Sequence, residues 1–154
     1  HGTLSGTAPT VTYTPALNYN GPDRITFTAA NATVDTAATV AITVTAVNDA
    51  PVASDQAVTT DEDTTKAITL GATDTEGASL TYTIGTGPTH GTLSGTAPAV
   101  TYTPAANYNG PDSFTFTAND GTLDANTATV TVTVTAVNDE IGRASCRERA
   151  DVMV

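Results

Sequence analysis

The feature that most constrains this sequence is that much of it is written twice. Three segments recur: residues 1–9 at 90–98, residues 18–23 at 107–112, and residues 46–49 at 136–139. A repeat of this length is a whole small domain rather than a single supersecondary unit. We therefore expect a window of a tandem array, with one complete repeat preceded by the back half of another.

The repeats predict where the domains begin and end. We expect residues 1–47 to be the C-terminal half of a repeat, residues 48–51 a linker, and residues 52–139 a complete repeat. Residues 140–154 break the pattern and carry three of the five basic residues and the single cysteine, Cys146. This stretch resembles a translated sequencing adapter, so we expect a non-native or disordered tail, with a native basic extension as the alternative. One cysteine outside the repeats provides no disulfide framework.

Apolar residues alternate with threonine at period two in both copies, which indicates strands buried on one face. Residues 129–135, for example, read Thr-Val-Thr-Val-Thr-Val-Thr. In the complete repeat the pattern predicts seven strands, at residues 56–60, 66–70, 80–84, 91–94, 100–102, 113–118 and 127–137. Turn residues separate them at about every eight to twelve positions, as in a sandwich. The expected fold class is therefore all-β, a seven-stranded antiparallel Greek-key sandwich preceded by a truncated copy.

The alternation also predicts the core. Its members are Val58, Ile68, Leu70, Leu80, Tyr82, Ile84, Leu93, Val100, Tyr102, Phe114, Phe116, Val130, Val132 and Val134. In the truncated copy the matching apolar residues would face a sheet whose partner strands are missing: Leu4, Val11, Tyr13, Ile25, Phe27, Val40, Ile42 and Val44. We expect residues 1–45 to be poorly stable alone and to pair strand edges with another chain.

Tyr108 lies at the corner that leads into the predicted strand at residues 113–118. Sandwich domains often place a tyrosine at this corner, with its hydroxyl bonded back to the backbone. Ordinary core packing is the other expectation for this side chain.

The net charge of −11 narrows the range of partners. Up to residue 139 the chain has thirteen Asp and Glu but only two basic residues, Arg24 and Lys66. Such a surface repels phosphate backbones and anionic lipids, so we expect no nucleic-acid partner. No apolar run approaches the roughly 20 residues of a membrane span, so we expect no membrane insertion in this segment. Acidity would attract cations, although it also keeps a threonine-rich surface soluble.

Three acidic clusters of the complete repeat fall in predicted loops, at residues 61–63, 74–77 and 119–121. In a sandwich the last two of these loops emerge at the end that receives Asn48 and Asp49 from the linker. Calcium takes about six to eight oxygen ligands, and no His or Cys joins the clusters to favour zinc or copper. Asp, Asn and Gly are also the residues that turns use, so turn formation is the competing interpretation.

The segments at 58–63, 70–77 and 114–121, together with the linker at 47–51 and the Asn-Tyr-Asn-Gly motif, resemble cadherin-like tandem repeats of large bacterial surface adhesins. The similarity covers residues 1–139. It implies a cadherin-like or immunoglobulin-like sandwich with calcium bound at the inter-domain junctions.

The resemblance also implies which residues bind calcium. At the first junction they would be Asn48, Asp49, Asp74, Glu76 and Asp120. At the second they would be Glu62, Asn138 and Asp139. Two departures from the family imply fewer ions or weaker binding: Glu76 replaces an aspartate, and residues 107–110 replace an Asp-Arg-Glu triplet.

No motif in the repeats supports catalysis. Residues 91–95, Gly-Thr-Leu-Ser-Gly, do not form the Gly-x-Ser-x-Gly nucleophile elbow, and we expect structural roles for His1 and His90. We expect a non-enzymatic, extracellular spacer repeat of a secreted or cell-surface adhesin, stiffened by calcium, with neighbouring repeats of the same chain as partners. The alternatives are an adhesive module that binds other cell-surface proteins or glycans directly, and an accessory domain of a secreted hydrolase.

Overall fold

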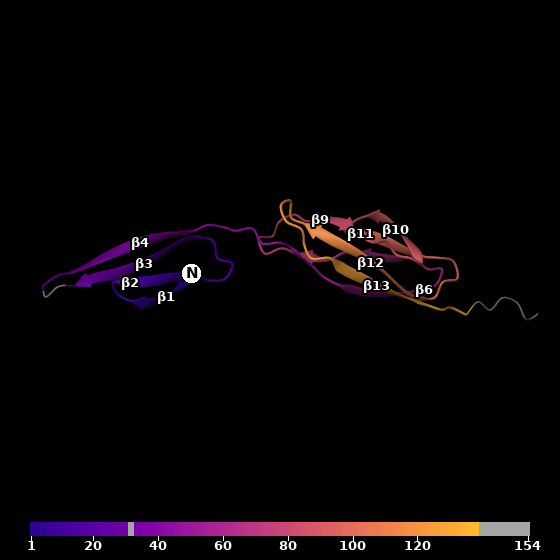
Figure 1. Ribbon diagram of the computed structural model, residues 1–154, viewed down its shortest axis with the longest axis horizontal. Coiled ribbons are helices and arrows are strands. Elements are labelled where there is room, and N and C mark those ends of the chain that lie inside the picture. The colour runs from indigo at the N-terminus through magenta and orange to yellow at the C-terminus, as the bar shows by residue number, and fades with distance from the viewer. Residues whose placement is uncertain (31–32, 139–154) are drawn as a thin grey trace, which may run out of the picture. The chain divides into compact units, whose positions relative to one another are not determined.

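The computed structural model describes residues 1–30 and 33–138, and every regular element among them is a β-strand (Figure 1). The chain divides into two compact units, His1–Asp49 and Ala50–Val154. In the described ranges no helix has the length and apolar character needed to cross a membrane. The tail expected at residues 140–154 lies outside the described residues, as does Asp139.

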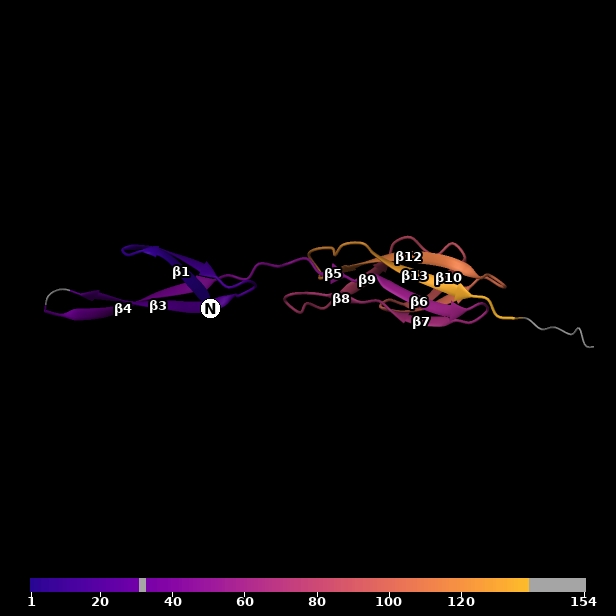
Figure 2. The same ribbon diagram turned by 90° about the horizontal axis from the view of Figure 1, so that it is seen from below.

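The second unit consists of two main sheets and one short strand pair. The first sheet has the order β6 (Gln56–Asp61), β13 (Ala128–Thr135), β12 (Gly110–Asn119) and β9 (Thr81–Ile84). The second has the order β10 (Gly91–Thr96), β11 (Ala99–Pro104) and β7 (Lys66–Thr69). The short pair is β5 (Val52–Ala53) with β8 (Ala72–Thr73), which Figure 2 shows at one end of this unit. Strands distant in sequence are neighbours in both main sheets, as in a Greek key.

The all-β sandwich predicted from the sequence is confirmed, and each of the seven predicted strands is present. One ladder differs from the expectation of antiparallel pairing: β6 and β13 run parallel, with Val58 opposite Val132. Alternation of valine and threonine predicts which face of a strand is buried. It carries no information about whether neighbouring strands run parallel or antiparallel. The strands β5 and β8 were missed because two residues are too few to show a period.

The core lies between the two main sheets, and Tyr102 and Phe116 at its centre have no exposed surface. All fourteen predicted core residues are buried or packed against buried residues. The sequence prediction missed four buried alanines: Ala53, Ala118, Ala125 and Ala128. Alanine occurs throughout the chain on both faces of strands, so its presence does not indicate which alternate positions of a strand are buried.

A buried carboxylate joins the two main sheets. Asp112 in β12 accepts hydrogen bonds from the Tyr102 hydroxyl in β11 and from the backbone amide of His90, both at 2.9 Å. Its second oxygen accepts from the amides of Thr89 at 3.0 Å and Ser113 at 2.9 Å. Burial by itself would raise the pKa of Asp112, but these hydrogen bonds outweigh burial and lower the pKa below its ordinary value. Burial and the bond to Asp112 raise the pKa of Tyr102.

The corner before β12 combines both expectations for Tyr108. Its hydroxyl donates to the carbonyl of Pro111 at 2.6 Å, three residues ahead rather than behind. The ring packs against the core and stacks on His90, with ring centroids 4.3 Å apart. Both histidines serve this structural role, since His1 stacks on Tyr19 in the same way at 4.5 Å.

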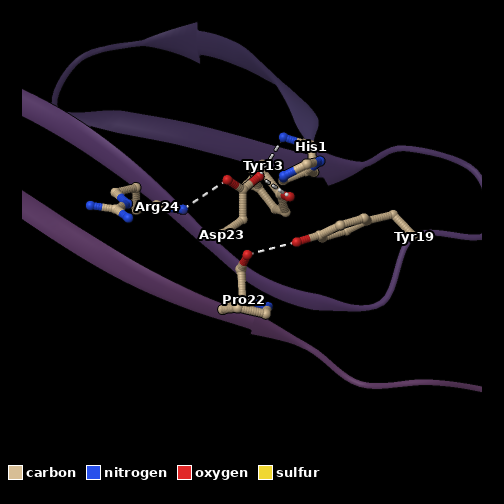
Figure 3. A network of polar contacts seen from close by, with 6 residues as sticks. All are labelled: His1, Tyr13, Tyr19, Pro22, Asp23 and Arg24. Atoms are coloured by element: carbon tan, nitrogen blue, oxygen red, sulfur yellow. Dashed lines mark hydrogen bonds and ion pairs between the residues drawn. The ribbon is translucent and has the colours of Figure 1, made fainter.

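The first unit consists of two hairpins, β1 (Gly2–Thr7) with β2 (Thr10–Pro15) and β3 (Gly21–Ala30) with β4 (Asp35–Val44). Their pairing registers repeat those of β10 with β11 and β12 with β13. The carboxylate network recurs as well: Asp23 accepts from the Tyr13 hydroxyl at 2.7 Å and from the Arg24 amide at 2.8 Å, and pairs with the amino terminus of His1 at 2.9 Å (Figure 3). Among its described residues, however, none is fully buried.

Candidate metal site

The chain enters the second unit at the end formed by β5, β8 and the loop that follows β12 (Figure 2). Val52 in β5 pairs with Thr73 in β8, and Asp74 follows Thr73 directly. The side-chain amide of Asn126 binds both backbone groups of Ala53, each at 3.0 Å. The fold therefore brings the loops that carry Asp74 and Asp120 to the end where the chain enters, as the sequence analysis expected.

The two carboxylate oxygens of Asp74 have different surroundings. Its Oδ1 accepts from the amide of Ala78 at 2.8 Å. Its Oδ2 is buried and has no hydrogen-bond partner among the residues that the structure describes. A buried polar atom without a partner costs free energy, and a bound cation would remove that cost. Of the predicted ligands, Asp74 has the surroundings that fit a metal ion best.

Asp120 shapes the loop that follows β12. Its Oδ1 accepts from the amides of Thr122 and Leu123, each at 2.7 Å, and from the Thr122 hydroxyl at 2.8 Å. The neighbouring Asn119 accepts from the amide of Gly121 at 2.6 Å. These are Asx-type turn bonds. The turn interpretation of this acidic cluster is therefore correct for Oδ1 of Asp120, whether or not the residue also binds a metal.

The remaining first-junction residues are exposed and belong to different units. Asn48 and Asp49 end the first unit, and Glu76 lies in the loop after β8 of the second. Among the described residues, no three His, Cys, Asp or Glu side chains form a group that could hold a metal. The five-residue site therefore stays a prediction, in which Asp74 and Asp120 share one end of a domain.

The second predicted set lies where the chain leaves the second unit. Glu62 is only 8% exposed, and its Oε1 accepts from the amide of Val137 at 2.7 Å. The side-chain amide of Asn109 approaches its Oε2 at 3.4 Å. Glu62 thus binds the backbone of Val137, the residue before Asn138. Asp139 lies outside the described residues.

Comparison with known proteins identifies the family. A family model described as a bacterial Ig domain matches residues 48–133. The chain belongs to the bacterial Ig domain family. The expected bacterial immunoglobulin-type, cadherin-like repeat is thereby confirmed. A comparison of this bacterial Ig chain with curated proteins gives no match.

Solved structures share the fold of this bacterial Ig chain. Domains EC1-2 of human mucin-like protocadherin are 20% identical with a TM-score of 0.54, and the alignment covers 88% of this chain and 81% of that one. Domains EC1-2 of human protocadherin-24 are 13% identical, with the same TM-score and coverage. These likenesses show a cadherin-like sandwich fold and nothing about ligands.

A likeness to a much larger protein is weaker. An endo-fucoidan hydrolase from glycoside hydrolase family 107 is 22% identical over 92% of this chain, with a TM-score of 0.45. The bacterial Ig chain spans only 23% of the length of that hydrolase. A likeness at this TM-score is no basis for an inference about function.

Two residues that sequence reasoning missed hold the first strands of this bacterial Ig domain in place. Asn126 clamps Ala53, and Asp55 accepts from the amide of Thr129 at 2.7 Å. In both cases the partner is a backbone group more than 70 positions away in sequence. No local pattern marks such a pair, because any residue supplies the backbone partner.

Proposed function

We propose that this bacterial Ig chain is a non-catalytic spacer repeat of an extracellular surface protein of the adhesin kind, whose partners are neighbouring repeats of the same protein. The observation that carries the proposal is the path of the chain through the second unit. Asn126, which clamps the first strand, precedes β13, and Val137, which Glu62 holds, follows it.

The chain thus enters and leaves at opposite ends of β13, a strand of 8 residues, or about 26 Å at about 3.3 Å per residue. Domain termini are often close together. A domain whose termini lie at opposite ends adds its full length to an array with every copy, which is the property that a spacer needs.

We propose in addition that calcium stiffens the junctions. The ligands would be Asn48, Asp49, Asp74, Glu76 and Asp120 at one junction, and Glu62, Asn138 and Asp139 at the other. All of these donors are oxygens, as calcium requires, and the buried Oδ2 of Asp74 lacks a hydrogen-bond partner among the described residues. When bound, the ion would supply positive charge between carboxylates that otherwise repel one another.

Calorimetric titration with calcium tests the metal, and the variant is Asp74→Asn. It keeps an oxygen for the amide of Ala78 but removes the charge. We expect saturable binding at roughly 10⁻⁴ to 10⁻³ M, as in extracellular modules, that is lost in the variant. The matched control is Asp35→Asn, an exposed carboxylate in β4 of the first unit, which should bind as the unaltered chain does.

Small-angle scattering of the same samples tests the stiffening. Calcium should narrow the distribution of maximum dimensions for the unaltered chain and for Asp35→Asn, but not for Asp74→Asn. An absence of binding heat at 10-fold above the expected range, about 10 mM, would leave Asp74 and Asp120 as turn formers. The spacer role, which rests on the path of the chain, would remain.

A further inference from the structure

The corner before β12 requires a glycine directly after Asn109. The backbone of Gly110 has a φ of 136°, a conformation that residues with a side chain rarely adopt. A Cβ at Gly110 would also lie 3.0 Å from the Tyr108 hydroxyl. That hydroxyl donates to the carbonyl of Pro111 at 2.6 Å, which fixes its position beside the glycine.

The first unit forms the same corner. Gly21 has a φ of 125°, and a Cβ there would lie 3.4 Å from the Tyr19 hydroxyl. Tyr19 donates to the carbonyl of Pro22 at 2.6 Å (Figure 3). Both copies therefore carry the dipeptide Asn-Gly at a place where the fold requires the glycine.

Asn109 is exposed, and its side chain is held only weakly. The side-chain nitrogen lies 3.4 Å from Oε2 of Glu62, beyond the usual range of about 2.7–3.2 Å for such a hydrogen bond. The next backbone amide belongs to Gly110, a residue without a Cβ. Nothing on that residue therefore hinders an approach of its nitrogen to the Cγ carbon of Asn109.

We propose that Asn109 is a deamidation site, and that its deamidation loosens the segment by which the chain leaves the second unit. The backbone nitrogen of Gly110 attacks Cγ of Asn109, and the side-chain nitrogen leaves as ammonia with the proton of the Gly110 amide. The succinimide that forms then takes up water at one of its two carbonyl carbons. The products are aspartate and isoaspartate, each with a carboxylate in place of the amide.

Glu62 connects this reaction to the exit segment. Glu62 is 8% exposed, and its Oε1 accepts from the amide of Val137 at 2.7 Å. Its Oε2 faces the side-chain amide of Asn109. Deamidation puts a second carboxylate beside Oε2, so two negative groups repel each other where a donor and an acceptor met before. Repulsion at about 4 Å is sufficient to make opening of the bond to Val137 about tenfold more frequent.

Other asparagines of the second unit lack this combination. Asn107 is followed by Tyr108, whose side chain hinders access to the next backbone nitrogen. Asn126 is followed by the β-branched Thr127, and its own side chain binds both backbone groups of Ala53 at 3.0 Å. Asn107 and Asn126 are therefore matched controls within the same chain.

Peptide mapping of the folded full chain tests the site, after incubation in mildly alkaline buffer that contains EDTA. Chymotrypsin cleaves after tyrosine, so cleavage after Tyr108 puts Asn107 and Asn109 in different peptides. We expect the mass gain of deamidation in the peptide that begins at Asn109 well before it occurs at Asn107 or Asn126. Equal rates at these three positions, no deamidation, or deamidation of Asn109 only in urea would overturn the assignment.

Hydrogen exchange at the amide of Val137, also in EDTA, tests the consequence independently of any metal. The Asn109→Asp variant has the carboxylate from the start, and its Val137 amide should exchange about tenfold faster than that of the unaltered chain. The matched control is Asn109→Gln, whose longer side chain keeps a neutral amide but reaches the next backbone nitrogen less readily.

Incubation should divide the unaltered chain into two populations that differ in exchange at Val137. The fast fraction should equal the fraction deamidated at Asn109, and Asn109→Gln treated in the same way should keep slow exchange. Equal exchange at Val137 in Asn109→Asp and in the unaltered chain would overturn the connection through Glu62.

Discussion

The hydroxyl of Tyr102 lies 2.9 Å from Oδ2 of Asp112, and this hydrogen bond links β11 in one sheet to β12 in the other. The first unit repeats the pair, with Tyr13 and Asp23 at 2.7 Å (Figure 3). Asp112 is 7% exposed and accepts from backbone amides as well as from the tyrosine. A single carboxylate therefore fixes how the two sheets of the sandwich meet.

Replacement of Asp112 by alanine should destabilise the second unit by about 2–4 kcal/mol. The change leaves the Tyr102 hydroxyl and the amides of Thr89 and His90 without their acceptor, and each buried donor left unpaired costs about 1–3 kcal/mol before relaxation. Urea unfolding measures the effect. Tyr102→Phe is the matched variant, because it removes one donor and should cost only about 1 kcal/mol. A value for Asp112→Ala within about 0.5 kcal/mol of the unaltered protein would contradict this role.

The same pair predicts how stability depends on pH. Because the pKa of Asp112 is lower in the folded chain than in the unfolded one, its contribution is complete above the unfolded pKa of about 3.9 and is lost as the pH falls through the folded value. The pKa of Tyr102 is raised, so its contribution is complete below about pH 10 and is lost above it. The melting temperature of the unaltered protein should therefore fall in acid. The melting temperature of the Asp112→Asn variant should fall less steeply between about pH 5 and pH 2. If the melting temperatures of both proteins fell equally steeply with pH, other carboxylates would be responsible for the loss of stability in acid.

The period-two pattern was sufficient to predict an all-β sandwich, because side-chain burial in a sandwich has the same period as the strands. It located seven strands and the residues from Val58 to Val134 that fill the core. It could not locate Ala118 or Ala128, because a small side chain occurs on either face of a strand. The pattern also could not predict that β6 and β13 pair in parallel, because the relative direction of two strands depends on how the chain connects them.

The candidate site was predictable only in part, for a related reason. The position of Asp74 and Asp120 at one end of the domain follows from which loops a sandwich places together. Their individual bonding does not, because Asp120 uses Oδ1 to form its own loop while Oδ2 of Asp74 is buried without a hydrogen-bond partner in the described structure. The hydrogen bonds from the side chain of Asn126 to Ala53 could not be predicted from the sequence, because the groups of Ala53 that they join are backbone groups.

Glu62 should stabilise the segment where the chain leaves the second unit. Its carboxylate accepts from the amide of Val137, so Glu62→Ala should destabilise this end by about 1–3 kcal/mol and speed amide exchange at Val137. Glu62→Gln is the matched control, because it keeps an acceptor oxygen and should retain most of the protection. Hydrogen exchange in EDTA measures this contact apart from any metal. Equal exchange at Val137 in all three proteins would show that the contact does not hold the segment.

Gly91, the first residue of β10, should not tolerate a side chain. A Cβ at this position would lie 2.5 Å from the Tyr102 ring and 2.7 Å from the carbonyl of Thr103. The ring of Tyr102 is fully buried and its hydroxyl is bonded to Asp112, so it cannot move aside. Gly91→Ala should therefore destabilise the second unit by about 1–3 kcal/mol, the usual cost of overpacking.

The matched control for Gly91→Ala is Gly87→Ala, where a Cβ meets nothing within 4 Å. This substitution should be neutral or slightly stabilising, because alanine reduces the conformational entropy of the unfolded chain. Urea unfolding of both variants measures the contrast. Equal stability would mean that Tyr102 can shift within the core, and the link from Tyr102 to Asp112 would then be too loose to fix the two sheets.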